Sequence, residues 1–497
     1  MKKLFLLFLG GFLALNLNAQ SINDAVRYST ENILGTARYR GVGGAFGALG
    51  GDLSALNNNP AGSSIFTVTQ ASATFGLTAY DNQTYYFDGI TTTDDNDVDL
   101  NQAGVVYVVP TNGRIGKLAL GFNYDKTANY NDTFVAAGRS NNSIDGYFLN
   151  FAQGTPLSLL KTQSGESIDD LYQYLGENES FGAQQAFLGF QGFVIDPVVD
   201  DDDNTQYVSN VGTGSFDQEY NHFSRGYSSK ASFNISAQVS PYIYLGANLN
   251  VHVIDYRKQT ILFEDNNNGG QVTSLRFENN LDVLGNGFSA QLGGIFQVAP
   301  DFRVGATYDT PTWYTISEEL TQSLVTDGAN GTQNISPNVV NVYEDYDLRT
   351  PGKITGSASY VFSNIGFLSF DYSYQDFGSI KFKPDDDPYF ASLNEDMSNT
   401  LKAVSTYKLG GEYKARNWAF RAGYRFQESP YEDEYALGNL TGYSLGVGYT
   451  FGNSRLDFAY DRATQERNPS LYDNNYTNTT FIDTINSAFL LTYSLNL

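Results

Sequence analysis

The sequence contains no cysteine and only two histidines among its 497 residues. The absence of cysteine excludes a disulfide scaffold, a thiolate metal site and a cysteine nucleophile. Two histidines leave little material for a histidine-rich metal centre or a proton relay. Basic residues are also scarce, because 29 Lys and Arg stand against 54 Asp and Glu, and the formal net charge is −25. A chain this acidic offers no basic surface for a nucleic acid.

Long apolar runs are missing beyond the N-terminus. The mean hydropathy of the chain is negative, which excludes a helical membrane protein with many apolar spans. Aromatic residues make up 15% of the chain, too many for a disordered protein. A transmembrane β-barrel satisfies both observations, because its strands turn apolar residues toward lipid and the alternate, polar residues toward the lumen.

The N-terminus has the pattern of a secretory signal peptide. Lys2 and Lys3 precede an apolar stretch from Leu4 to Leu15, and the small residue Ala19 follows before Gln20. The stretch is too short for a membrane-spanning helix. We therefore expect residues 1–19 to be a cleaved signal peptide, and with no cysteine after it a lipoprotein anchor is excluded.

The rest of the chain repeats an alternation of apolar and polar residues with period two, the pattern of strands with one apolar face. It is clearest at the C-terminus, where Phe489, Leu491, Tyr493, Leu495 and Leu497 share one face. Outer-membrane barrels end on such a strand, although an aromatic residue usually closes it. The pattern predicts fourteen strands, near residues 68–80, 102–110, 118–130, 229–240, 243–263, 271–298, 302–317, 352–362, 365–378, 401–414, 417–427, 442–451, 455–465 and 486–497.

The connections between these strands alternate in length. Short ones are predicted at 110–117, 240–242, 299–301, 363–364, 415–416 and 452–454. Outer-membrane barrels combine short periplasmic turns with long external loops, so this alternation places both termini in the periplasm. The expected fold is all-β, an antiparallel transmembrane barrel of about 14 strands within residues 67–497, with a long external loop at about 131–228. We expect a monomer surrounded by outer-membrane lipid and lipopolysaccharide.

Aromatic residues lie where a barrel meets the membrane interface. Trp418, Phe420, Tyr424 and Phe426 share one face of a predicted strand, as in an aromatic girdle. The alternative is the core of an aromatic-rich soluble sandwich. That fold needs a second apolar sheet to cover the first.

Acidic residues gather where we expect long connections, at 94–99, 200–203, 264–265 and 385–387. Asp95, Asp97 and Asp99 copy the first ligand positions of an EF-hand calcium loop. However, Leu100 stands where that loop needs a glycine, and Val106 stands where it needs a glutamate. We therefore expect solvated external loops and no metal site.

Residues 20–66, between the predicted signal peptide and the first strand, are rich in Gly and Ala, and they include the tripeptide Asn59-Pro60-Ala61. A dinucleotide site is excluded, because Phe46 stands where the third glycine of its motif should fall. Small residues let a chain pack closely against surrounding walls. We expect this segment to plug the lumen, since a barrel of fourteen strands would otherwise hold an open channel.

The Gly- and Ala-rich segment, the tripeptide Asn59-Pro60-Ala61 and the fourteen predicted strands resemble the FadL/TodX family of outer-membrane transporters of hydrophobic compounds. The resemblance covers essentially the whole mature chain, and the tripeptide matches the hatch motif of the family. It implies an N-terminal hatch, capture of a hydrophobic or amphipathic small molecule by external loops, rearrangement of the hatch, and lateral exit through a gap near the third strand. No motif distinguishes a fatty acid from an aromatic hydrocarbon, and no cofactor is expected.

Two sets of residues are candidates for ligand binding. In the long loop, Ser167 to Asp170 form a capping box that predicts a short helix ending at Gly176, and an apolar stretch follows. The candidate capture residues are Leu171, Leu175, Phe181, Phe187, Leu188, Phe190 and Phe193. The alternative is that these residues pack the loop against itself and cap the barrel.

In the lumen, Arg421 and Arg425 are candidates for binding a ligand carboxylate, because a guanidinium binds a carboxylate through two hydrogen bonds. The alternative is that they pair with acidic side chains of the barrel and the hatch. No enzyme is expected, since neither histidine lies in a recognisable catalytic constellation. The rival function is a plugged barrel that serves as a docking or structural platform for other envelope or secretion proteins.

Overall fold

The computed structural model of the chain describes residues 20–111, 116–363, 365–472 and 478–497. The predicted signal peptide, residues 1–19, lies outside the described residues. Within them, no helix is both long and apolar enough to cross a membrane.

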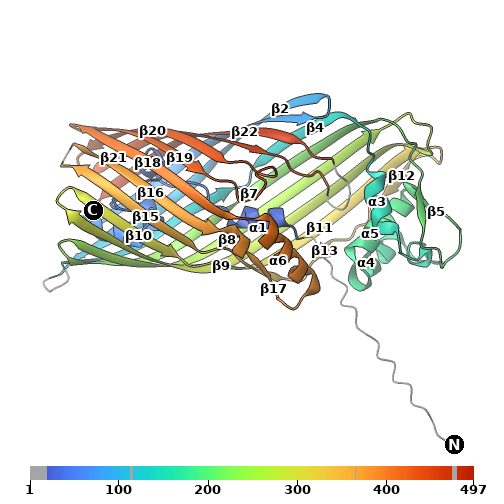
Figure 1. Ribbon diagram of the computed structural model, residues 1–497, viewed down its shortest axis with the longest axis horizontal. Coiled ribbons are helices and arrows are strands. Elements are labelled where there is room, and N and C mark those ends of the chain that lie inside the picture. Colours follow the sequence, from blue (N-terminus) through green and yellow to red (C-terminus); the bar gives the residue numbers. More distant parts are fainter. Residues whose placement is uncertain (1–19, 112–115, 364, 473–477) are drawn as a thin grey trace, which may run out of the picture.

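The strands form one closed antiparallel barrel (Figure 1). Each barrel strand pairs with the next along the chain, and β22 pairs with β1 to close the ring. The predicted fold class, a transmembrane barrel of 14 strands, is therefore confirmed. The strands are β1 (Gln70–Tyr86), β2 (Gly89–Pro110), β3 (Lys117–Asn129), β7 (Phe216–Ser240), β8 (Ile243–Asp265), β9 (Val272–Ala299), β10 (Phe302–Asp309), β15 (Lys353–Phe362), β16 (Gly366–Asp376), β18 (Ala403–Ala415), β19 (Trp418–Gln427), β20 (Leu440–Phe451), β21 (Ser454–Arg467) and β22 (Phe481–Asn496).

Four of these strands continue beyond a break. β4 (Asp132–Ser140) extends β3, β11 (Trp313–Gly328) extends β10, β14 (Tyr346–Arg349) precedes β15, and β17 (Lys381–Lys383) follows β16. The breaks before β11 and β15 contain Pro311 and Pro351. Proline interrupts a ladder because it has no N–H to donate. Short strands outside the wall pattern are β5 (Ile195–Pro197), β6 (Tyr207–Ser209), β12 (Gln333–Ile335) and β13 (Asn341–Val342).

The outer face of the barrel is apolar and the inner face is polar. On β8, Leu249 points outward with 69% of its surface exposed, whereas its neighbours Asn248 and Asn250 point inward and are buried. No second sheet covers the outer face (Figure 1), so the soluble sandwich is excluded for the described residues. Lipid is the solvent that stabilises such a surface.

The first hairpin is longer than predicted. β1 and β2 stay paired up to Tyr86 and Gly89, so residues 94–99 lie on β2. The expectation that this acidic run forms a loop was wrong, because backbone pairing with β1 overrides the low strand propensity of aspartate. Glu264 and Asp265 likewise end β8, whereas residues 200–203 and 385–387 lie outside strands.

A helical cap covers one end of the barrel, opposite the end where the chain terminates (Figure 1). It is built from α3 (Asp145–Ala152), η3 (Leu157–Leu159), α4 (Ile168–Asn178) and α5 (Phe181–Gln191), and we call residues 141–215 the cap. The predicted capping box of Ser167 and Asp170 is present. The helix ends at Asn178 rather than at Gly176, which lies inside it and packs closely against Gln184 of α5. β4 and the start of β7 occupy both ends of the loop predicted at 131–228.

The connection between β16 and β18 carries η4 (Phe377–Ser379), β17 and α6 (Pro388–Thr400). We call this connection, residues 377–402, the excursion. Phe382, Phe390 and Met397 of this excursion share a buried cluster with Val26 and Tyr28 from the N-terminal part of the chain. The excursion therefore packs against the segment that enters the lumen.

Candidate ligand-binding lumen

Residues 20–66, here called the N-terminal segment, lie inside the barrel as α1 (Ile22–Ser29), α2 (Ala37–Arg40), η1 (Ser54–Asn57) and η2 (Pro60–Ile65) (Figure 1). The segment is hydrogen-bonded to opposite sides of the wall. The N–H of Gly43 donates to the hydroxyl of Ser444 on β20 at 3.0 Å. On β8, the amide of Asn248 donates to the carbonyl of Leu56 at 2.9 Å. These contacts cross-link the segment to strands that face each other across the lumen.

The tripeptide Asn59-Pro60-Ala61 lies against β8 and β9. The side chain of Asn59 accepts a hydrogen bond from the N–H of Ala61 at 3.1 Å, which caps η2. The same side chain donates to the carbonyl of Gly294 at 3.0 Å. On β8, a Cβ at Gly246 would come within 2.5 Å of the Pro60 backbone, so only glycine fits there. The tripeptide thus fixes the N-terminal segment to the wall at close range.

Arg421 lies in a buried ion-pair network with the N-terminal segment. Its Nε donates to Glu412 at 2.6 Å, and its Nη1 lies 2.8 Å from Asp457. Arg38 of the N-terminal segment binds the same Glu412 at 3.1 Å. The guanidinium of Arg421 therefore has two acidic partners, as in the alternative that the sequence left open.

Arg425 lies four residues further along β19, on the same inward face. It binds Asp461 at 2.5 Å, and Arg40 of the N-terminal segment binds that same carboxylate at 3.0 Å. Unlike Arg421, Arg425 lines the cavity described next. Of the two arginine candidates, Arg425 is thus the one that a ligand in this cavity can contact.

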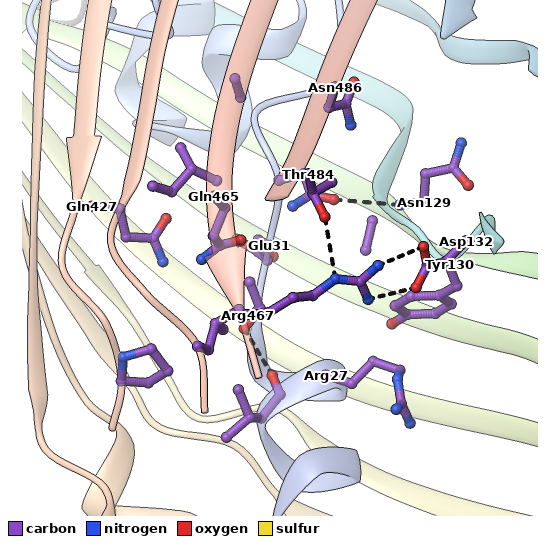
Figure 2. Close-up of a pocket in the computed structure, with 18 of the residues that line it drawn as sticks. Arg27, Glu31, Asn129, Tyr130, Asp132, Gln427, Gln465, Arg467, Thr484 and Asn486 are labelled. Carbon is purple, nitrogen blue, oxygen red and sulfur yellow. Dashed lines mark hydrogen bonds and ion pairs between the residues drawn. The ribbon is translucent and has the colours of Figure 1, made fainter. Parts of the chain in front are cut away.

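A cavity of about 610 Å³ lies in the lumen beside the N-terminal segment (Figure 2). Its lining reverses the charge balance of the chain, since it carries nine basic and five acidic side chains. The basic ones are Arg27, Arg40, Lys126, Lys230, Lys258, Lys353, Lys408, Arg425 and Arg467, and the acidic ones are Asp24, Glu31, Asp125, Asp132 and Glu428. An excess of cations in an acidic protein favours an anionic ligand at this place.

The charges of the cavity differ in how fully they are paired. Arg467 binds Asp132 at 2.7 Å and Thr484 at 3.2 Å (Figure 2). The side chains of Lys258 and Lys408, by contrast, have no ion pair or hydrogen bond with any described residue. Aromatic rings also line the cavity, among them those of Tyr130, Phe134, Tyr220, Tyr256 and Tyr431. Free ammonium groups beside aromatic rings suit a molecule with an anionic head and an apolar body.

The wall beside this cavity lacks part of its backbone ladder. β2 pairs with β3 only from Gln102 to Pro110. Among the described residues, the preceding part of β2, residues 89–101, pairs only with β1, and β4 pairs only with β7. We call the boundary between residues 89–101 and 126–140 the seam.

Side chains bridge the seam in place of a ladder. Lys126 is ion-paired with Asp99 and lies 3.7 Å from Asp97. The hydroxyl of Thr93 donates to the carbonyl of Thr133 at 2.6 Å. Because Lys126 also lines the cavity, the lumen and the seam meet at this residue. No cluster of acidic or histidine side chains that could hold a metal ion occurs among the described residues.

The cap brings most of the predicted capture residues into one packed core. Four of them, Leu171, Leu175, Phe187 and Leu188, are buried together, and Phe190 packs against them. Phe181 is partly buried in a second cluster, beside α1. Phe193 is 38% exposed. The arrangement resembles the alternative of a packed cap more than an open groove. Among the seven candidate capture residues, Phe193 is the one with a largely exposed apolar side chain.

Sequence reasoning did not single out Glu31, Lys230 and Lys353. Lys230 and Lys353 lie on the inward face of their strands, which the alternation with apolar neighbours could have indicated. Glu31 lies in an irregular stretch between α1 and α2, where no periodicity exists to orient a side chain.

No protein-family model matches the sequence, and no curated protein matches it. Solved structures do match. A Pseudomonas aeruginosa FadL homologue superimposes with a TM-score of 0.54 at 12% identity, covering 94% of this chain and 99% of that one. The Pseudomonas putida toluene transporter TodX gives 0.53 at 13% identity, covering 94% and 100%. The chain has the fold of FadL- and TodX-type channels.

A third solved structure supports the same statement. The CymD monoaromatic hydrocarbon channel superimposes with a TM-score of 0.50 at 14% identity, covering 93% of this chain and 97% of that one. The resemblance predicted from the sequence is thus confirmed for the fold of FadL- and TodX-type barrels. Identities this low concern architecture alone, so the ligand must be argued from the lumen.

Proposed function

We propose that this chain is an outer-membrane channel for the uptake of hydrophobic or amphipathic small molecules resembling long-chain fatty acids. One observation carries the proposal: a transmembrane barrel holds a lumenal cavity of about 610 Å³ that reaches, at Lys126, a part of the wall without a backbone ladder. This volume lies within the roughly 300–1,000 Å³ typical of small-molecule sites. The descriptions of the similar structures, a toluene transporter and a monoaromatic hydrocarbon channel, support it.

The proposed path begins at the cap and ends in the membrane. Phe193 and its neighbours in the cap capture the molecule, and the cavity receives it with its head toward the lysines and its apolar body against the tyrosines. The N-terminal segment acts as the hatch, held by Asn59, Pro60 and Ala61. After the hatch rearranges, the molecule leaves sideways through the seam into lipid. The C-terminus faces the periplasm in this proposal, because it lies with the short turns opposite the cap (Figure 1).

Equilibrium binding to the refolded mature barrel tests the proposal. The ligands are palmitate, toluene and haem, and correct folding is checked by the altered gel mobility of an unheated barrel. We expect saturable binding of palmitate, weaker in Arg425→Gln, whose side chain lines the cavity. Absence of saturable binding in a folded barrel would contradict the proposal and favour the docking platform.

A further inference from the structure

Glu31 of the N-terminal segment bridges two lysines that come from distant strands. Its carboxylate lies 3.2 Å from Lys230 on β7 and 3.0 Å from Lys353 on β15. β8, β9 and β10 separate these strands in the wall. The carboxylate therefore joins two lysines from separate parts of the wall through one negative charge.

The bridge lies in the cavity wall and not in the packed core. All three side chains line the cavity, and Glu31 is 40% exposed to it whereas Lys230 is 6% exposed. Lys230 and Lys353 hold the pKa of Glu31 well below its ordinary value, so the carboxylate is charged at neutral pH. A soluble anion that enters the cavity thus meets the same two ammonium groups that Glu31 occupies.

Whereas α1 packs in a buried cluster, the irregular residues 30–35 that carry Glu31 have few hydrogen bonds to the wall besides the bridge. The N–H of Asn32 donates to the carbonyl of Thr127 on β3 at 2.7 Å. On the preceding α1, Arg27 lies over the ring of Tyr256, 4.6 Å from its centroid. Removing the Glu31 bridge would therefore free one of a small number of polar ties between residues 30–35 and the wall.

We propose that Lys230 and Lys353 form an anion site that Glu31 occupies as an internal mimic of the ligand, and that the anionic head of an entering amphiphile displaces Glu31 and releases this stretch of the hatch. The proposal rests on the proposed function and adds to it the residues that receive the head group and the event that couples binding to hatch movement. The unpaired Lys408 lines the same cavity and adds positive charge for the displacing anion.

The test compares laurate with dodecanol, which has the same chain length and no charge. In the full mature barrel, Glu31→Gln removes the competing charge but keeps the shape of the side chain. We expect the variant to bind laurate about fivefold more tightly or better, the lower range of measured couplings between sites, and to bind dodecanol as the parent does. Lys230→Met with Lys353→Met should reduce laurate affinity to that of dodecanol.

Glu428→Gln is the matched control. Glu428 lines the same cavity, but it accepts a hydrogen bond from the N–H of Ser405 at 2.9 Å and touches neither lysine. The Glu428→Gln variant removes the same charge as Glu31→Gln. An equal gain in laurate affinity in both variants would therefore show a general electrostatic effect and overturn the inference. Unchanged laurate affinity in Glu31→Gln would also overturn it. Failure of the parent barrel to bind either ligand would instead refute the proposed function.

Discussion

Arg421 is expected to stabilise the barrel rather than to bind ligand. Its side chain is 1% exposed and contacts the carboxylates of Glu412 and Asp457. Removing one partner of a buried ion pair costs about 3–5 kcal/mol. In Arg421→Met, Glu412 keeps its contact with Arg38. Asp457 keeps its contact with Arg455. We therefore expect the free energy of unfolding to fall by about 3 kcal/mol, the lower end of this range. This loss lowers the ratio of folded to unfolded protein roughly a hundredfold.

Urea unfolding of the refolded barrel in lipid vesicles, followed by tryptophan fluorescence, measures this loss. Arg257→Met is the control, because Arg257 is 72% exposed and its contact with Asp282 at 3.3 Å should contribute about 0–1 kcal/mol. Palmitate affinity per folded molecule should be unchanged in Arg421→Met. A variant as stable as the parent, or a folded variant that no longer binds palmitate, would refute the reasoning.

Three further predictions concern the N-terminal segment and the cap. Asn59→Ala removes hydrogen bonds to two backbone carbonyls, so conductance in planar bilayers should rise as the segment loosens; unchanged conductance would contradict this. Leu188→Ala leaves a cavity in the cap core at a cost of about 2–5 kcal/mol, so limited proteolysis should cut the cap while the barrel survives. Lys230 and Lys353 lower the pKa of Glu31 from its ordinary value of 4.5. The charged Glu31 therefore stabilises the fold fully at pH values above 4.5, and this stabilisation declines as the pH falls through the lowered pKa. The stability difference between the parent and Glu31→Gln should therefore be present near neutral pH and vanish in strong acid.

The strands that cross lipid could be predicted because lipid imposes period two on their polarity. The last strand shows this, since Phe489, Leu491 and Tyr493 point outward while Leu490 and Thr492 are buried within. The extension of the first hairpin could not be predicted. Asp94 and Asn96 occupy outward positions on β2, so the polarity no longer alternates there although the backbone ladder with β1 continues.

The candidate site was predicted in part. Alternation along β19 correctly turns Arg421 and Arg425 inward, because side-chain direction follows from position on a strand. Their partners depend on cross-strand register and on where the N-terminal segment lies, which no local pattern encodes. The bridge from Glu31 to Lys230 joins residues 199 positions apart, so it emerges only when the barrel closes around the segment.

Closing the seam tests most directly whether the cavity empties sideways into the membrane. The parent chain has no cysteine, so Thr93→Cys with Thr133→Cys places one thiol pair across the seam. Asn250→Cys with Ser289→Cys, a register pair on the intact β8–β9 ladder, is the control. Uptake of labelled palmitate is measured in Gram-negative cells that lack their own fatty-acid channel. The account predicts that oxidation abolishes uptake through the seam variant, that reduction restores it, and that the control is unaffected; equal uptake by the oxidised and reduced seam variant would contradict it.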